Sequence, residues 1–176
     1  RKAAGDISAN PALAASLLQG DFNNTFQVYT NLEEKVESHG AVVGFDFSLP
    51  SNFNTGFNYN WNKLISKQSG SFIFDFNTPE HKTNIYLSNR KLVDNFGFNV
   101  NWRWQSEFEW VSSFADGTVP AFSTLDAQVS YTIPQYSATI KAGGSNLFNK
   151  QYIGSYGAPS IGGVYYVSIT FDQLFR

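Results

Sequence analysis

The chain has 176 residues, of which 42% are hydrophobic, 17% aromatic and only 15% charged, with a formal net charge of −2. This length predicts one ordinary domain, and the many aromatic residues exclude a disordered chain. The charge excludes the basic field that holds nucleic acid. The lack of cysteine excludes disulfides, thiolate metal sites and thiol catalysis. The lack of any run of about 20 apolar residues excludes a transmembrane helix.

The N-terminal part predicts a short helix and then one or two strands. Residues 10–20 contain an Asn-Pro pair, a run of Ala, Leu and Ser, and a closing Gly, which is the pattern of a short capped helix. Apolar residues hold one parity over 26–32 and the other over 41–49. Either a hairpin turns at 33–35, which gives eight strands in the chain, or one long strand contains a bulge near Gly40, which gives seven.

Six later stretches alternate between apolar and polar residues. In the first of them, Phe, Tyr and Trp occupy odd positions and Asn occupies most even ones. Neighbouring side chains on a strand point to opposite faces, so each stretch predicts a strand with one apolar face and one wet face. We therefore predict an all-β antiparallel protein. The stretches are residues 53–62, 84–90, 95–110, 124–133, 136–143 and 165–172.

Two architectures fit this alternation. In a soluble sandwich the apolar face lies inside, whereas in an outer-membrane barrel it faces lipid and the polar face lines a lumen. Several predicted strands reach the roughly 9 to 11 residues that span a bilayer. Aromatic residues gather towards strand ends, as in the girdles of membrane barrels, and most polar positions hold uncharged Asn, Gln, Ser or Thr. These features favour the membrane barrel.

The parity then assigns residues to the two sides of the predicted barrel wall. A Lys or Arg on the lipid side near the midplane costs about 2 to 4 kcal/mol, and Asp46, Arg103, Asp126 and Lys141 all have the polar parity. The predicted lipid-facing residues are Phe57, Tyr59, Trp61, Phe98, Val100, Trp102, Trp104, Val129 and Ile140. The predicted lumen-facing residues are Asn58, Asn60, Asn62, Asn99, Asn101, Arg103, Gln105, Asp126, Gln128 and Lys141.

The links between predicted strands alternate in length. Outer-membrane barrels have short periplasmic turns and longer outside loops, so the same order here places the C-terminus in the periplasm. The short links are residues 49–52, 91–94 and 133–135, and the long links are residues 66–81, 111–121 and 148–162.

Several segments resemble the C-terminal part of TonB-dependent outer-membrane receptors, in particular the Bacteroidetes type, SusC-like proteins included. The most specific is Asn146-Leu147-Phe148-Asn149-Lys150-Gln151-Tyr152. The resemblance covers about residues 26–172. Where many relatives carry Gly-x-Glu, this chain has Gly40-Ala41-Val42, which favours the single long strand. The other matching segments are residues 77–82, 119–126 and 156–171.

This resemblance implies a division of the chain and of a larger barrel. Residues 1–21 would be an outside loop with the short helix, and residues 22–176 would be the C-terminal seven or eight strands of a transmembrane β-barrel of about 22 strands. The family's N-terminal plug and TonB-contacting box are not in this sequence. Since methionine and a signal peptide are also missing, we expect the chain to be part of a longer polypeptide.

The implied function is active uptake of a bulky nutrient (glycan, peptide, metal chelate or vitamin) across the bacterial outer membrane. The implied partners are outer-membrane lipid, the rest of the same barrel and its plug, TonB and, optionally, a surface lipoprotein, with no nucleic acid. Two other interpretations stay open: a complete eight-strand outer-membrane pore or structural barrel, and a soluble carbohydrate-binding β-sandwich. The resemblance also implies that the outer-membrane insertion machinery recognises the final strand, through Tyr165, Val167, Ile169, Phe171 and Phe175.

No enzyme, cofactor or metal site is predicted. His39 lies near Glu37 and His81 lies in a predicted loop, and neither has a second ligand at a useful spacing. The Gly pairs at 143–144 and 162–163 precede no helix and so are not phosphate cradles. Carboxylates such as those of Glu107, Glu109 and Asp116 are more typical of a solvated rim than of an acid pair. The aromatic residues considered for substrate contact, with girdle or loop packing favoured instead, are Trp110, Tyr152 and Tyr156.

Overall fold

The computed structural model describes residues 35–66, 75–112 and 115–171, together with Ala15 and Leu18. Ala15 and Leu18 have helical backbone. The other residues of the predicted helix lie outside the described residues. Most of the residues that decide between a hairpin and a bulged strand also lie outside the described residues.

The chain divides into two units, one of residues 1–39 and 64–76 and the other of residues 40–63 and 77–176. In the described part of the first unit, the Glu37 N–H donates to Ser66 Oγ at 2.6 Å. The Ile65 N–H donates to the Glu37 carbonyl at 2.9 Å. The second unit holds nearly all of the sheet.

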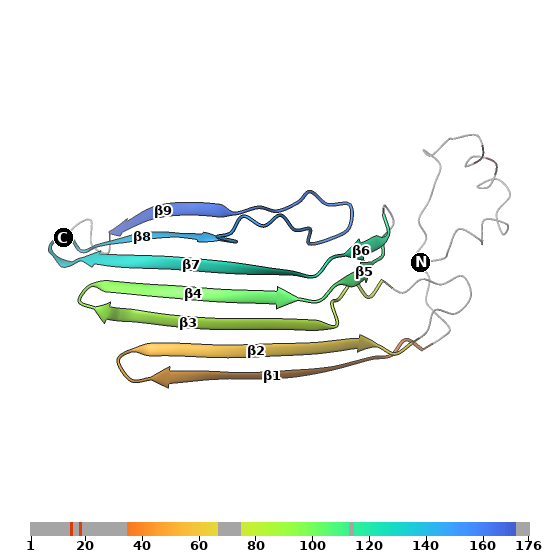
Figure 1. Ribbon diagram of the computed structural model, residues 1–176, viewed down its shortest axis with the longest axis horizontal. Coiled ribbons are helices and arrows are strands. Elements are labelled where there is room, and N and C mark those ends of the chain that lie inside the picture. Colours follow the sequence, from red (N-terminus) through yellow and green to blue (C-terminus); the bar gives the residue numbers. More distant parts are fainter. Residues whose placement is uncertain (1–14, 16–17, 19–34, 67–74, 113–114, 172–176) are drawn as a thin grey trace. The chain divides into compact units, whose positions relative to one another are not determined.

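Seven long strands form one antiparallel sheet, in which every strand but one lies beside the strand that follows it in the chain (Figure 1). The exception is β4, which pairs with β7. Within the described residues β1 and β9 are the outer strands. The all-β antiparallel prediction is confirmed. The strands are β1 (Ser38–Leu49), β2 (Phe53–Leu64), β3 (His81–Val93), β4 (Phe96–Gln105), β7 (Phe122–Ile133), β8 (Ala138–Ser145) and β9 (Val164–Phe171).

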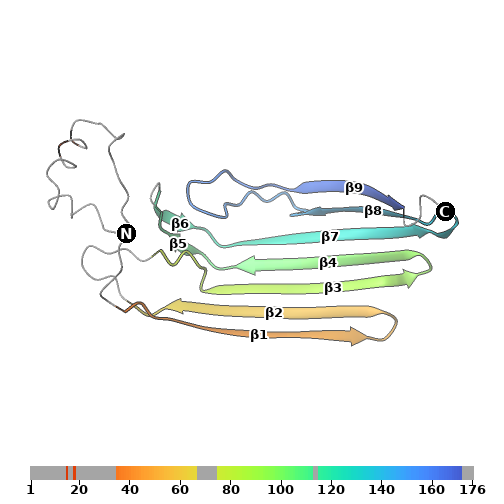
Figure 2. The ribbon, with the colours of Figure 1, turned by 180° about the vertical axis from the view of Figure 1, so that it is seen from behind.

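Short turns and long connections lie at opposite ends of this sheet, as the link lengths predict. In Figures 1 and 2 the turns β1–β2, β3–β4 and β7–β8 share one end, and the connections β2–β3, β4–β7 and β8–β9 leave from the other. We call these the turn end and the loop end. The left-handed backbone that tight turns require falls at Ser51, Asn52, Asn95 and Ser137, where φ is 60°, 63°, 65° and 45°.

Tyr136, predicted to begin a strand, instead ends a 3₁₀ turn (Pro134–Tyr136), and β8 begins at Ala138. Three further boundaries differ from those the sequence predicts. The alternation over 95–110 is not one strand: β4 ends at Gln105, and residues 108–110 form β5 (Phe108–Trp110), which pairs with β6 (Gly117–Val119) in a separate two-stranded sheet. Period two persists across this break because any strand has it, whichever strand it pairs with. His81 begins β3 rather than lying in a loop.

The third difference is at the turn end of β3, where residues 91–93 belong to the strand and not to the link. The register between β3 and β4 shifts between Asn89 and Val93, which marks a bulge. The side chain of Asn89 is fully buried there. It donates to the Ser51 carbonyl and accepts from the Lys91 N–H, both at 2.8 Å. Asn89 thus joins the β1–β2 turn to the bulge.

The main sheet is a single layer with two different faces. Among the described residues, Val119 and Ala138 are the only buried hydrophobic side chains, whereas Val43, Tyr131 and Val167 are 58%, 49% and 74% exposed. A soluble sandwich requires a second sheet packed on the apolar side, and the described residues contain no such sheet. Among these residues, no helix is long and apolar enough to cross a bilayer.

One contact joins β1, β2 and β3 on the polar side of the sheet. The Tyr86 hydroxyl donates to Asp46 Oδ1 at 2.6 Å. Gly56 lies between the two, and a Cβ atom built on it would collide with both the Tyr86 ring and the Asp46 carboxylate. The absence of a side chain at residue 56 therefore permits the three-strand contact.

We expect Gly56→Ala to destabilise the fold by about 1 to 3 kcal/mol, because the added methyl group must displace the Tyr86 ring or the Asp46 carboxylate. Gly154→Ala is the matched control, since a Cβ atom at residue 154 has no neighbour within 4 Å. The measurement is denaturant unfolding of the purified protein, followed by circular dichroism. Equal unfolding midpoints for the two variants would contradict the expectation.

Candidate functional site

Strand register divides the main sheet into an apolar face and a polar face. Residues directly opposite in an antiparallel pair point to the same face. One cross-strand row therefore runs through Phe57, Ile85, Trp102 and Leu125 on the apolar face, and the next runs through Asn58, Asn84, Arg103 and Thr124 on the polar face.

All nine residues predicted to face lipid lie on the apolar face, and all ten predicted to face a lumen lie on the polar face. The assignment of each set to one face follows from the backbone register alone. What each face meets in the intact protein remains a prediction.

An ion pair and its neighbours occupy the loop end of the polar face. Arg103 donates to Asp126 Oδ2 at 2.6 Å. The other carboxylate oxygen, Asp126 Oδ1, accepts the Asn146 N–H at 2.9 Å. Asp126 thus joins β4 and β7 to the first residue of the β8–β9 loop. Sequence analysis places Arg103 and Asp126 on one face but misses the contact with Asn146.

The Asn-Leu-Phe-Asn motif at the start of this loop has a structural role. The side chain of Asn146 is 3% exposed. It donates to the Lys150 carbonyl at 2.9 Å and accepts the Lys150 N–H at 3.2 Å. Asn149 Oδ1 accepts the Gly163 N–H at 2.8 Å, which brings the two ends of the loop together. Asn146 and Asn149 have φ of 50° and 49°, a conformation that Asn tolerates better than most residues.

The three aromatic residues considered for substrate contact all pack within the loop end. The Tyr152 ring stacks on Phe122 with ring centroids 4.1 Å apart. Trp110 contacts Phe108 of the same short strand, edge to face. Tyr156 covers Gly117, where an added Cβ atom would meet its ring. All three rings therefore make packing contacts with neighbouring residues of the described chain.

Three aromatic residues on the polar face were not singled out from the sequence. The Tyr86 hydroxyl binds Asp46, and the Tyr166 hydroxyl donates to Gln128 Oε1 at 2.8 Å. Phe122 has no polar atom and stacks on Tyr152 instead. The sequence does contain a signal for these residues, because each is an aromatic residue at a position where the alternation of its strand predicts a polar one.

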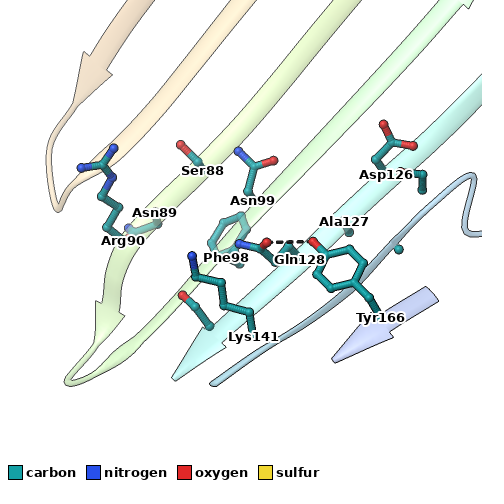
Figure 3. A pocket seen from close by; sticks show the side chains of 13 residues that line it. Ser88, Asn89, Arg90, Phe98, Asn99, Asp126, Ala127, Gln128, Lys141 and Tyr166 are labelled. Atoms are coloured by element: carbon teal, nitrogen blue, oxygen red, sulfur yellow. Dashed lines mark hydrogen bonds between the residues drawn. The ribbon is translucent and has the colours of Figure 1, made fainter. Parts of the chain in front are cut away.

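The polar face is hollowed at several places. One hollow has a volume of about 660 Å³. Arg90, Lys141, Gln128 and Tyr166 project from the sheet around it (Figure 3). A smaller recess of about 280 Å³ lies at the loop end and is bordered by Phe122 and Tyr152. Both combine amide, hydroxyl and cationic groups with aromatic rings, which suits noncovalent binding.

The titratable groups of the loop end make structural contacts. His81 Nδ1 forms a 2.7 Å hydrogen bond with the Tyr59 hydroxyl, and the two rings stack. The Trp61 indole donates to Glu80 Oε1 at 3.1 Å. This hydrogen bond, partly opposed by desolvation and assisted by the Lys63 ammonium, lowers the pKa of the Glu80 carboxyl below its usual value.

The carboxylates and histidines of the described residues do not gather in a metal centre. Over that part of the chain, no three His, Cys, Asp or Glu side chains gather in a group that could hold a metal ion. Glu109 accepts a hydrogen bond from the Thr118 hydroxyl at 2.7 Å, and Asp116 accepts the Ser112 N–H at 2.8 Å. His39 lies exposed on β1.

No protein-family model matches this sequence, and no curated protein matches it. Solved structures do. The FrpB iron transporter of Neisseria meningitidis matches at a TM-score of 0.58 and 12% identity, over 76% of this chain and 23% of that chain. A mutant of the ferric enterobactin receptor of Pseudomonas aeruginosa matches at 0.56 and 14% identity, over 76% of this chain and 22% of that chain.

The siderophore receptor PiuA of Acinetobacter baumannii matches similarly, with a TM-score of 0.55 and 13% identity over 76% of this chain and 22% of that chain. The sheet therefore has the fold of a fragment of a TonB-dependent receptor barrel. The chain spans less than a quarter of the length of each of these three structures.

We expect Asp126→Asn to loosen the start of the β8–β9 loop, because it removes the charge that binds both Arg103 and the Asn146 N–H. Hydrogen bonds to a charged group contribute about 1.5 to 3 kcal/mol each. Hydrogen exchange at residues 146–150 should rise at least tenfold, on the order of 1.4 kcal/mol. Asp94→Asn is the control, since it breaks only the exposed pair with Lys91. Unchanged exchange in Asp126→Asn would refute the role of Asp126.

Proposed function

We propose that this chain is the C-terminal barrel part of a TonB-dependent transporter for active uptake of a bulky nutrient across the bacterial outer membrane. The observation that carries the proposal is the single-layered sheet. Its apolar face has no protein layer over it among the described residues, and its fold matches a fragment of such barrels. In this arrangement the apolar face meets lipid and the polar face lines the lumen.

Strand lengths support a membrane-spanning sheet. Strands β1, β2, β3 and β7 have 12, 12, 13 and 12 residues, and β4 has 10. A tilted strand needs about 9 to 11 residues to cross a bilayer. With the loop end outside and the turn end in the periplasm, β9 runs towards the periplasm, which puts the C-terminus there.

The proposed partners follow from the surfaces that the sheet leaves uncovered. Among the described residues, β1 and β9 each pair with a strand on one side only. An unpaired strand edge in lipid leaves backbone groups without hydrogen bonds, so the rest of the barrel would pair with both edges. The plug occupies the lumen over the polar face, and TonB acts on the intact receptor. A Bacteroidetes-type system with a surface lipoprotein is the variant that the sequence resemblance favours. Glycans, peptides, metal chelates and vitamins are the substrate classes.

Spin labels on β4 test which face meets lipid. Labels at residues 98, 100 and 102 of the intact protein in bilayers should be reached by lipid-dissolved oxygen. Labels at residues 99 and 101 should be reached by a water-soluble quencher, because the two sets lie on opposite faces. A label at Tyr136, in the turn between β7 and β8, is the exposed control. If both reagents fail to reach the even positions, these side chains lie in a protein core and the proposal is wrong.

The C-terminal strand generates a second test, on assembly. Tyr165, Val167, Ile169 and Phe171 share the apolar face of β9, whereas Phe175 lies outside the described residues. Replacing both Phe171 and Phe175 by Ser should sharply lower the amount of protein in the outer membrane, because it removes two aromatic residues from the apolar alternation of the final strand. Tyr166→Ser, on the opposite face of the same strand, is the control. Unchanged outer-membrane levels of the double variant would contradict the assembly role.

A further inference from the structure

The recess of about 280 Å³ at the loop end has the composition of a ligand site. Its floor consists of two successive cross-strand rows on the polar face. One row is Asn60, Lys82, Gln105 and Phe122, and the next contributes Asn84, Arg103 and Thr124. Neighbouring strands lie about 4.8 Å apart, and rows on one face about 6.7 Å apart along the strand. Two such rows offer the footprint of a six-membered ring.

One wall of the recess is a stacked aromatic pair. Tyr86 and Tyr166, the other aromatic residues on the polar face, each donate a hydroxyl hydrogen bond to a polar neighbour. Phe122 has no such group, and its ring is instead covered by Tyr152 at 4.1 Å with an interplanar angle of 24°. Both rings are only half-buried. They present a flat apolar surface on an otherwise polar face, against which a second ring can stack.

The position of Tyr152 is held by backbone pairing in its own loop. Tyr152 N–H donates to the Ile161 carbonyl at 3.2 Å, and Ile161 N–H donates to the Tyr152 carbonyl at 2.7 Å. The Asp126–Asn146 contact fixes the start of the same loop. The aromatic wall is therefore present before any ligand arrives.

Among the residues that the structure describes, the charges around the recess leave one cation, Lys82, without an ion-pair partner. Arg103 is neutralised by Asp126, whose carboxylate lies 2.6 Å from its guanidinium. Lys82 is exposed, and over the residues that the structure describes no carboxylate forms an ion pair with it. The amides of Asn60, Asn84 and Gln105 supply both donors and acceptors around this ammonium group.

We propose that this recess binds a compact ring that carries an anionic group. The ring stacks on the Phe122–Tyr152 wall, the anion binds Lys82, and hydroxyl groups on the ring bind the surrounding amides. An aromatic acid and an acidic sugar share this chemistry, and the ring would be one part of the bulky substrate. The inference rests on the proposed function only in that the polar face is accessible to water in the transporter.

Ligand-observed NMR on the intact protein in detergent micelles tests the proposal, with empty micelles as background. The probes are salicylate and glucuronate, and their neutral counterparts are phenol and glucose. The variants Lys82→Gln and Tyr152→Leu remove the cation and the outer ring of the wall. Lys91→Gln and Tyr136→Leu are matched controls, because Lys91 lies in the part of β3 next to the turn end and Tyr136 lies in the turn between β7 and β8, both away from the recess. Lys82→Arg keeps the positive charge.

At least one acid should bind more tightly than its neutral counterpart. Lys82→Gln should weaken that acid about tenfold, because a charge-assisted hydrogen bond is lost. Lys82→Arg and both controls should bind it as the native protein does. Tyr152→Leu should weaken acid and neutral ring alike, by about three- to tenfold. The acid that binds identifies the source of the ring.

Failure of both acids to bind the native protein would overturn the proposal. Unchanged affinity for the acid in Lys82→Gln and Tyr152→Leu would also overturn it. The same holds if the two control variants lose as much affinity as these two variants do. The assay requires neither TonB nor transport. Its failure is therefore distinguishable from failure of the proposed function, which the spin labels on β4 report separately.

Discussion

The absence of a protein layer over the apolar face of the sheet is the constraint on which the rest of this structure depends. A soluble domain of this size stabilises its sheet by packing apolar side chains into a shared core. Here the large apolar residues of seven strands point outward from one layer, and only Val119 and Ala138 are buried hydrophobic side chains among the described residues. Backbone hydrogen bonds hold the strands to one another. The described residues do not cover this apolar face. Its burial can stabilise the protein only if a bilayer or further polypeptide covers it.

The contrast between the two faces also explains which polar contacts are made. On a lipid-facing surface an unpaired polar group is costly, whereas a hydrated surface tolerates it. The charged residues of β4, β7 and β8 accordingly lie on the polar face, where Arg103 and Asp126 form a direct pair and Lys141 borders the larger hollow. Polar groups of the loop end instead bind one another, as Trp61, Glu80 and Lys63 do. Neutral hydrogen-bonded aromatic residues near strand ends are typical of a membrane interface.

The alternation of apolar and polar residues predicted the strands and their faces, because it depends only on neighbouring positions along the chain. The ends of the alternating stretches then predicted the order of short and long links. The alternation could not predict changes of pairing partner. β5 keeps the alternation of β4 and yet pairs with β6, since a strand looks the same in sequence whichever neighbour it has. Contacts distant in sequence were equally hidden. The Asp126–Asn146 hydrogen bond joins residues 20 apart, and the stacking of Tyr152 on Phe122 depends on the path of a loop with no period at all.

The distribution of buried residues along the strands completes the physical argument. Among the described residues, the buried side chains at the loop end are Pro79, Val119, Thr124 and Asn146, and those at the turn end are Asn89 and Ala138. The other buried residues of the described strands are Gly56, Gly97 and Gly144, which have no side chain to pack. Protein packing therefore fixes the two ends of the sheet and leaves a central band to be covered from outside. In the proposed arrangement that band coincides with the hydrocarbon region, whose thickness the long strands match. The ligand recess lies beside the well-packed loop end, where its wall keeps a fixed geometry without relying on lipid.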